Sequence, residues 1–343
     1  MVHSGALYVR QHGHVVRHCQ QAQPAFSALV ADAELAVNET VYVVPTSDAS
    51  DFRARLDQYG IGYRTADSHQ VPEVDRSVCD THNLLCIGER VFSSRRIVTI
   101  LAGQCLAAGV TVITGATVAA VAHAEGKISG VILESGHLHA PYVVIAAGTG
   151  TAQLLSTLGS RQAPLLRSRL DMMIYLPAFR LRRGLIFAAL DRPVVMPTHK
   201  GGALASFFGG VQPEITGRRA FSVDLGKATA LLQQTLRALT PATADPHGAV
   251  AYVAGKTDYV GTTHTEQGII NPGYHVIDHA TADDIHGLYT IVTGKMTLGF
   301  HASKAVTDAI LNIDQQLVMH PETAPDTPAP LIAAEPWAPP AQP

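Results

Sequence analysis

The sequence predicts an α/β protein of 343 residues that folds into two domains. An unbroken apolar run at 142–147 ends at Gly148. This pattern is typical of a strand that is buried on both faces of a parallel sheet. The same order of apolar strand and glycine returns at 287–294. The stretch from 165 to 260 is instead rich in alternating polar and apolar residues, which is typical of half-buried strands. A second, β-rich domain of α+β type accounts for this stretch.

A helix is expected over 97–108, because apolar side chains recur there at helical spacing. Gly109 follows directly and suits the left-handed conformation that often ends a helix. A short strand is expected next, at 110–113.

The remaining strands are expected from apolar runs and from alternation. Two of them form a hairpin whose turn is Ala124-Glu125-Gly126-Lys127. The expected strands are 117–122, 128–134, 142–147, 172–176, 194–197, 205–208 and 287–292. A final helix is expected through 302–310, where alanine and β-branched residues recur at helical spacing.

Composition and charge exclude several classes of partner. The formal net charge is −3 at pH 7 and the basic residues are scattered, so no nucleic-acid partner is expected. The four cysteines form no Cys-x-x-Cys pair, which favours a reducing, cytoplasmic location. No apolar run reaches the roughly 18 residues of a membrane span, and no signal peptide is recognised. The expected partner is a small molecule, and peripheral contact with a membrane stays open.

The last part of the sequence, 319–343, is rich in proline and alanine and poor in large apolar side chains. Such a composition buries too little apolar surface to offset the entropy of ordering, so this tail is expected to be disordered.

Four motifs in a fixed order carry a resemblance to a known family. They are His3-Ser4-Gly5-Ala6-Leu7-Tyr8, Ala107-Ala108-Gly109-Val110, Val143-Val144-Ile145-Ala146-Ala147-Gly148, and Asp278-His279 followed by Gly287 to Thr297. The set resembles the FAD-dependent glycerol-3-phosphate dehydrogenases within the D-amino-acid oxidase superfamily. Each motif alone is weakly or moderately specific, but their common order covers nearly the whole chain.

The resemblance implies a glutathione-reductase-like, Rossmann-type FAD-binding domain built from 1–36, 93–160 and 270–318. It assigns 37–92 and 161–269 to the substrate domain. Relatives open with a strand and a G-x-G-x-x-G turn that receives the pyrophosphate at a helix N-terminus. This chain starts after that step, so the FAD domain is expected to be N-terminally truncated, with weak FAD affinity and apolar exposure beside 143–147. Three explanations of the missing segment are open: a start codon assigned too late, a truncated gene, or a pyrophosphate site supplied by another chain.

The resemblance also implies which residues meet the cofactor. The turn at 294–297 would stabilise the charge that grows on the flavin, since a cation or helix N-terminus does so. The implied cofactor residues are Thr117, Val118, Ala147, Gly148, Thr149, Gly294, Lys295, Met296 and Thr297.

Substrate recognition departs from the relatives. Leu7 and Phe300 stand where they carry arginine, and Lys256 replaces a third arginine. Arginine matches phosphate in a way that leucine and phenylalanine do not, so a less charged hydroxy or amino compound is favoured over glycerol 3-phosphate. Lys295 and Lys256 are the expected catalytic cations, and His3 is a candidate base, with His199, His264 and His301 as further candidates.

The expected function is oxidation of a small alcohol by hydride transfer to flavin N5. Electrons would pass to a quinone, a protein or oxygen. The alternatives are an amino-acid or amine oxidase of the same superfamily, and a non-catalytic remnant or partner subunit. No metal is expected, although His14 and His18 lie one helical turn apart.

Overall fold

The computed structural model describes residues 4–35, 39–188, 193–198, 201–207, 222–240, 245–260 and 273–311. The candidate base His3, the histidines 199 and 264, and the tail at 319–343 lie outside these residues.

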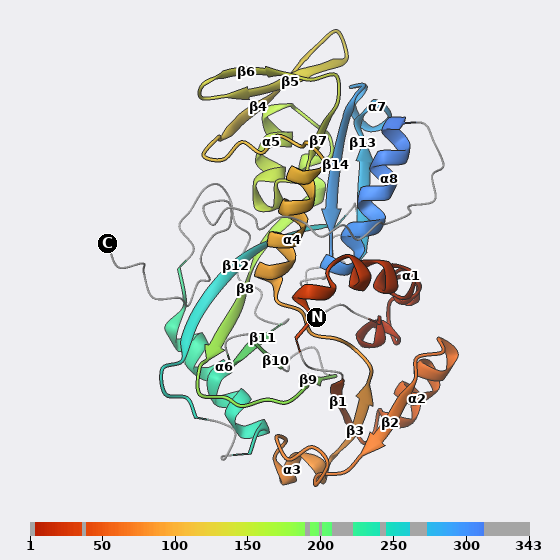
Figure 1. Cartoon of the computed structure of the whole chain (residues 1–343), viewed down its shortest axis with the longest axis vertical. Coiled ribbons are helices and arrows are strands. Elements are labelled where there is room, and N and C mark those ends of the chain that lie inside the picture. Colours follow the sequence, from red (N-terminus) through yellow and green to blue (C-terminus); the bar gives the residue numbers. More distant parts are fainter. Residues whose placement is uncertain are drawn as a thin grey trace.

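Three sheets make up the described part of the chain (Figure 1). The large sheet has the order β12-β8-β11-β10-β9-β1-β3-β2. Its strands are β1 (Thr40–Pro45), β2 (Tyr63–Ala66), β3 (His82–Ile87), β8 (Leu166–Leu176), β9 (Gly184–Phe187), β10 (Pro193–Pro197), β11 (Ala203–Phe207) and β12 (Val250–Tyr259). The two smaller sheets have the orders β13-β14-β7 and β4-β5-β6. Their strands are β4 (Val118–Ala124), β5 (Lys127–Leu133), β6 (Gly136–His139), β7 (Val143–Ile145), β13 (Tyr274–Asp278) and β14 (Leu288–Thr293).

Helices cover these sheets and connect them (Figure 1). The α-helices are α1 (Gly13–Leu29), α2 (Ala49–Gln58), α3 (Arg76–Cys79), α4 (Ser94–Ala107), α5 (Thr151–Thr157), α6 (Leu225–Ala238), α7 (His279–Asp283) and α8 (Gly299–Leu311). The 3₁₀ turns are η1 (Ala6–Tyr8), η2 (Ala31–Ala33), η3 (Gly148–Gly150), η4 (Ala163–Leu165) and η5 (Met296–Leu298). None of the helices within the described ranges is long and apolar enough to cross a bilayer.

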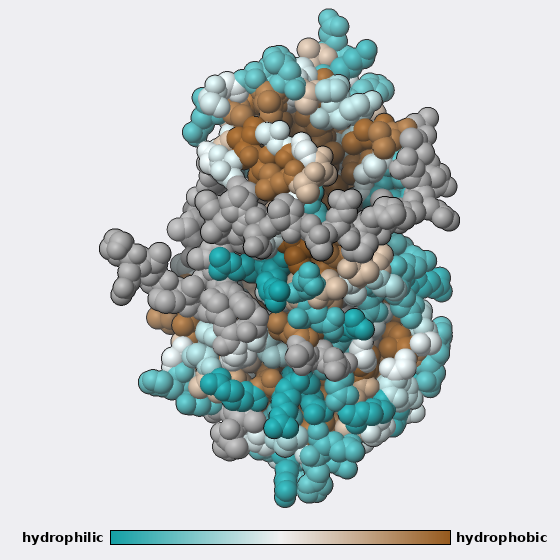
Figure 2. All heavy atoms as spheres, in the orientation of Figure 1, coloured by the Kyte–Doolittle hydropathy of each residue, from teal (hydrophilic) through white to brown (hydrophobic). Residues whose placement is uncertain are grey.

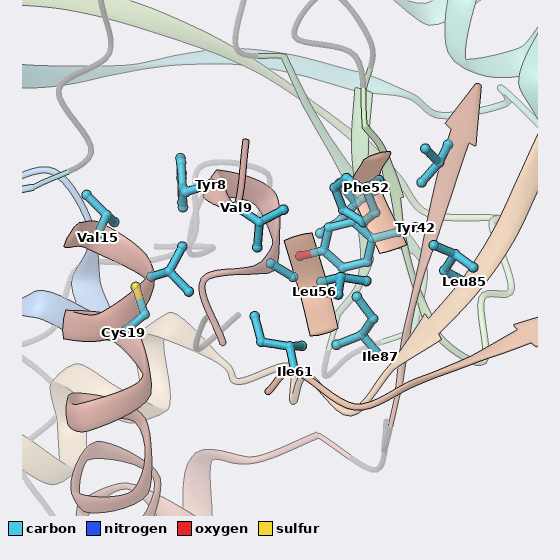
Figure 3. Close-up of a cluster of buried hydrophobic side chains, with 14 of the residues drawn as sticks. Tyr8, Val9, Val15, Cys19, Tyr42, Phe52, Leu56, Ile61, Leu85 and Ile87 are labelled. Carbon is cyan, nitrogen blue, oxygen red and sulfur yellow. The ribbon is translucent and has the colours of Figure 1, made fainter. Parts of the chain in front are cut away.

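The large sheet is covered on both faces along β1, and the alternation of its side chains explains why. Val41 and Val43 belong to the apolar cluster that includes leucines of α6. Tyr42 and Val44 point to the opposite face, where they meet η1, α1 and α2. Figure 3 shows this second cluster, in which Val9 of the N-terminal segment lies between Tyr8 and Tyr42.

Two features hold the N-terminal segment against the sheet. Gly5 has φ of +94°, and a Cβ there would lie 2.7 Å from the Cα of Val16, so only glycine allows η1 to pack on α1. The carboxylate of Glu89 is fully buried and accepts hydrogen bonds from the Ser4 hydroxyl at 2.6 Å and the Tyr42 hydroxyl at 2.7 Å. Together they fix the position of Tyr8, which follows in η1.

Several expected elements are confirmed. The helix before Gly109 is α4, and the glycine adopts φ of +79° as its cap. The hairpin turn is also present, because Glu125 and Gly126 have φ of 50° and 71°, the mirror-image turn that suits two twisted strands. The strands expected in the second domain correspond to β8, β10 and β11, and the C-terminal pair to β14 and α8.

Two expected strands, at 110–113 and at 142–147, differ from the structure. Residues 110–113 form no strand, and Val110, Val112 and Ile113 are 50%, 42% and 57% exposed. The run at 142–147 gives only the short β7, in which Val144 is 38% exposed rather than buried on both faces. β7 pairs with β14 on one side, and no strand of the described residues pairs with its other side. The apolar exposure expected beside 143–147 is therefore confirmed. Figure 2 shows apolar surface gathered where Figure 1 places β7 and the end of α4.

Candidate functional site

Four charged side chains lie together on one face of the paired strands β8 and β12. The register sets Lys256 opposite Arg169. Side chains two residues apart on a strand share a face, so Asp171 and Asp258 lie on the same side as these two cations. Arg169 Nε lies 3.3 Å from Asp171 Oδ1, and Arg169 Nη1 lies 3.3 Å from Asp258 Oδ2. Lys256 Nζ lies 3.2 Å from Asp258 Oδ1. These four residues form the charged cluster.

The charged cluster is buried, and some of its nitrogen and oxygen atoms make ion pairs but no well-oriented hydrogen bond. The side chains of Arg169 and Asp258 are only 10% and 3% exposed. Arg169 Nε and Nη1 and Asp258 Oδ1 are nevertheless without a well-oriented hydrogen-bond partner among the described residues. Buried polar atoms of this kind are costly unless a further group satisfies them. Arg169 thus has N–H groups that can donate to an anionic oxygen.

Lys295, between β14 and η5, lies close enough to the charged cluster to interact with its charges. Its Nζ lies 4.9 Å from the centre of the Tyr8 ring, a cation–π contact. Burial, together with the positive charge of Arg169, lowers the pKa of Lys295 to about 8, against the opposing charges of Asp171 and Asp258. Burial likewise lowers the pKa of Lys256 to about 8. Both lysines are therefore mostly charged at neutral pH but close to losing their protons.

The balance of charge in this region is positive. Arg169, Lys256 and Lys295 are three cations that interact with two carboxylates, those of Asp171 and Asp258. One positive charge is left over at neutral pH. Burial raises the pKa of Asp171, and the neighbouring cations counter this. An arrangement with an excess cation in a low-dielectric environment favours an anionic ligand.

The opposite face of β8 and β12 connects to the end of β7. The hydroxyls of Ser168 and Thr257 lie 2.7 Å apart, and Thr257 donates a hydrogen bond of 3.0 Å to the carbonyl oxygen of Gly148. Gly148 has φ of +54°, and a Cβ there would meet nothing within 4 Å. Ala147 beside it is exposed. The strand end is thus open on the side where a flat group could approach.

The structure brings some of the expected site residues together and separates others. Lys256 and Lys295 meet at the charged cluster, and Gly148 lies against the strand that carries Lys256. Thr149 follows in η3. The turn at 294–297 includes buried Gly294 and Thr297 and the 39% exposed Met296. Thr117 and Val118 lie at the start of β4, in a different sheet. Their contact with a cofactor stays a prediction.

Sequence reasoning missed Arg169, Asp171 and Asp258. A signal for them was present: Arg-x-Asp at 169–171 and Lys-x-Asp at 256–258 lie within strands, where a spacing of two puts both charges on one face. What the spacing leaves open is which two strands are neighbours, and the register of β8 with β12 supplies this.

The histidines of α1 lie close to one another and to His301. The rings of His14 and His18 are 6.3 Å apart, and that of His301 is 5.6 Å from His18. His301 Nε2 contacts the carbonyl oxygen of His18 at 3.0 Å, so this candidate base faces α1. In the part of the chain that the structure covers, no group of three or more His, Cys, Asp or Glu side chains could hold a metal ion.

Three comparisons relate the chain and its fold to known proteins. A family model described as DAO, FAD dependent oxidoreductase, matches residues 1–309. A comparison with curated proteins gave no match. Solved structures with the same fold include a glycine oxidase from Geobacillus kaustophilus, with 16% identity and a TM-score of 0.64 over 90% of this chain and 82% of that one. A mutant of NikD, an unusual amino acid oxidase essential for nikkomycin biosynthesis, has 16% identity and a TM-score of 0.68, covering 91% and 82%. An L-proline dehydrogenase from P. horikoshii has 13% identity and a TM-score of 0.65, covering 87% and 79%.

Proposed function

The chain belongs to the DAO family of FAD-dependent oxidoreductases, with FAD as its cofactor, and from this premise we propose that it oxidises a small carboxylate-bearing amine. The bond that is oxidised is the C–H bond next to nitrogen. One observation carries the choice: the charged cluster and Lys295 together hold one positive charge in excess.

The residues near Gly148 suit one part of the cofactor. Gly148 has no side chain that could collide with a flat ring, and the space beside it is open to 4 Å. We propose that Ala147, Gly148 and Thr149 lie along the flavin, and that the turn at 294–297 offers backbone N–H groups and the Lys295 charge to it. FAD held there would supply the acceptor for the hydride that leaves the substrate carbon.

The remaining steps belong to side chains of this chain. Lys256 and Arg169 attract the carboxylate of the substrate through their positive charges. Lys295 keeps its charge for the flavin, and the substrate nitrogen loses its proton to water before the hydride leaves. The substrate thus loses a hydride and a proton, and an imine is left. Oxygen, a quinone or a protein would reoxidise the cofactor.

An alcohol is the second candidate substrate, because the motif from Gly287 to Thr297 resembles that of the glycerol-3-phosphate dehydrogenases. Glycerol 3-phosphate itself is disfavoured, since Leu7 and Phe300 stand where those enzymes carry cations. The amine is preferred because the proteins of like fold named above are an amino acid oxidase, a glycine oxidase and a proline dehydrogenase.

Two lysine variants test the proposal in protein loaded with FAD. Lys256→Met should weaken the binding of a carboxylate by about tenfold or more and leave the flavin potential unchanged. Lys295→Met should lower the potential and slow anaerobic flavin reduction by roughly thirty- to thousandfold. The exposed Lys127→Met is the matched control and should change neither property.

The measurement is stopped-flow reduction of the bound flavin by a panel of amino acids, N-methyl amino acids and hydroxy acids. If no member of the panel reduces the flavin, the proposed function is wrong. If both site variants shift the potential equally, the division of roles between Lys256 and Lys295 is wrong.

A further inference from the structure

The face of β8 and β12 that carries the charged cluster continues beyond it with apolar side chains. The register sets Ala254 opposite Asp171, and then Tyr252 opposite Met173. All lie on the face of Lys256, because each is separated from it by an even number of residues along the paired strands. Lys256 thus begins a strip of side chains on this face, which continues with Ala254 and ends at Tyr252 and Met173. We call these side chains the recognition strip.

The end of this strip is an apolar pair. The Tyr252 hydroxyl lies 3.3 Å from Met173 Sδ, so the two side chains are packed together across the strands. Both are half-buried, unlike Met172 and Ile174, which point to the opposite face and are almost fully buried. A thioether beside an aromatic ring is an adaptable surface for another apolar group.

Ala254 leaves room between the charged end and the apolar end. Successive pairs on one face of a sheet lie about 7 Å apart along the strands, so the Tyr252 and Met173 pair begins roughly two such steps from Lys256. A side chain that ends at Cβ fills little of this interval. A ligand whose carboxylate is held at Lys256 would lie over Ala254, with its other end against Tyr252 and Met173.

We infer that the substrate of this site is an amphipathic acid, with a carboxylate at one end and an aromatic or extended apolar group at the other. This inference rests on the proposed function, which supplies the carboxylate, and it adds the part of the substrate that distinguishes one acid from another. Tyr252, Met173 and Ala254 set this preference. The smallest acids of the class fill only the charged end.

Binding of unreactive acids to the full chain tests the inference directly. The probes are 3-phenylpropanoate, in which two carbon atoms join the ring to the carboxylate, and propanoate, which lacks the ring. Isothermal titration calorimetry should show binding of 3-phenylpropanoate about tenfold or more tighter, since a buried ring adds apolar contact area. Equal affinity for the two probes would overturn the inference.

Ala254→Leu should remove the preference for the aromatic acid, because the larger side chain fills the path over position 254. Ala119→Leu, at an exposed position of β4, is the matched control and should keep the preference. Tyr252→Ala removes the aromatic surface without adding volume, and it should also abolish the preference. Retention of the preference in both Ala254→Leu and Tyr252→Ala would contradict the inference.

The same panel separates this inference from the proposed function. Flavin reduction by carboxylate-bearing amines without regard to the apolar group would support the function and overturn the inference. An aromatic preference in binding, with no reduction by any acid of the panel, would overturn the function and leave the recognition strip in place.

Discussion

At the scale of single residues, the two lysines of the site differ from ordinary surface lysines. Each is surrounded by protein, which disfavours the charged form, and each lies near the guanidinium of Arg169, which adds to the effect. The carboxylates of Asp171 and Asp258 offset only part of it. The result is a pair of amines that change charge within the range in which enzymes work.

This titration predicts how anion binding depends on pH. The pKa of each lysine is lowered from 10.5 to about 8, so both are charged below that pH and lose their charge as the pH rises through it. The affinity for 3-phenylpropanoate should therefore fall by about tenfold or more from one unit below to one unit above the midpoint, measured by calorimetry. In Lys256→Met the fall should be shallower. Affinity that is constant over this range would show that neither lysine meets the carboxylate.

The sequence found these two lysines but not their partners. Lys295 was recognised through the motif that surrounds it, and Lys256 through its place in another motif. Arg169 and Asp171 belong to no motif. They matter because β8 lies beside β12, and a pairing between segments some eighty residues apart is set by tertiary packing rather than by local pattern.

At the scale of elements, the start of β14 leaves no room for a side chain. Gly287 has φ of +84°, and a Cβ there would lie 2.5 Å from the carbonyl oxygen of Pro141 and 2.9 Å from a methyl group of Ile128. Its own carbonyl accepts a hydrogen bond of 2.9 Å from the N–H of Val143. Three strands, β5, β7 and β14, therefore meet at one glycine.

Gly287→Ala should cost about 2 to 4 kcal/mol in the free energy of unfolding, since both the backbone conformation and the space exclude a side chain. Gly109→Ala is the matched control: its φ is also positive, but a Cβ would meet nothing within 4 Å. It should cost only about 1 kcal/mol. Urea unfolding followed by circular dichroism measures both values. Equal losses would mean that the close approach to Pro141 is unimportant.

The sequence predicted elements with local causes well and those with distant causes poorly. The hairpin turn at Glu125 and Gly126 is set by the conformations its own residues allow, and α4 by its spacing and cap. The strand at 110–113 was wrong for the opposite reason. Apolar β-branched residues favour an extended chain, but a strand exists only where another strand offers hydrogen bonds.

At the scale of the whole molecule, apolar side chains are exposed on β7, at the edge of the sheet β13-β14-β7, and in the segment that follows α4. Val110, Val112 and Ile113 are about half exposed, and Val144 on β7 is 38% exposed. Strand edges with apolar neighbours are sites of association between chains. This surface is distinct from the recognition strip on the large sheet.

Val144→Lys should therefore raise the monomeric fraction of the protein and lower its binding of the dye ANS, because a charge on an edge strand opposes association. Size-exclusion chromatography with light scattering measures the first, and fluorescence the second. Leu225→Lys is the control, since Leu225 is 74% exposed but stands alone on α6. An equal effect of the two changes would mean that total apolar exposure matters and the edge does not.

The alternation along β12 has a consequence for how this enzyme can change over evolutionary time. Thr257 donates a hydrogen bond to Gly148, while Lys256 and Asp258 on either side of it belong to the charged cluster on the opposite face. Substitutions at every second position can alter what is recognised without disturbing this hydrogen bond. An insertion or deletion of one residue would exchange the two faces of the strand. The side chain that now bonds to Gly148 would point away from β7, and the charged side chains would point toward it. The strand is thus open to new side chains but closed to changes of length, and new specificities should arise here by point mutation alone.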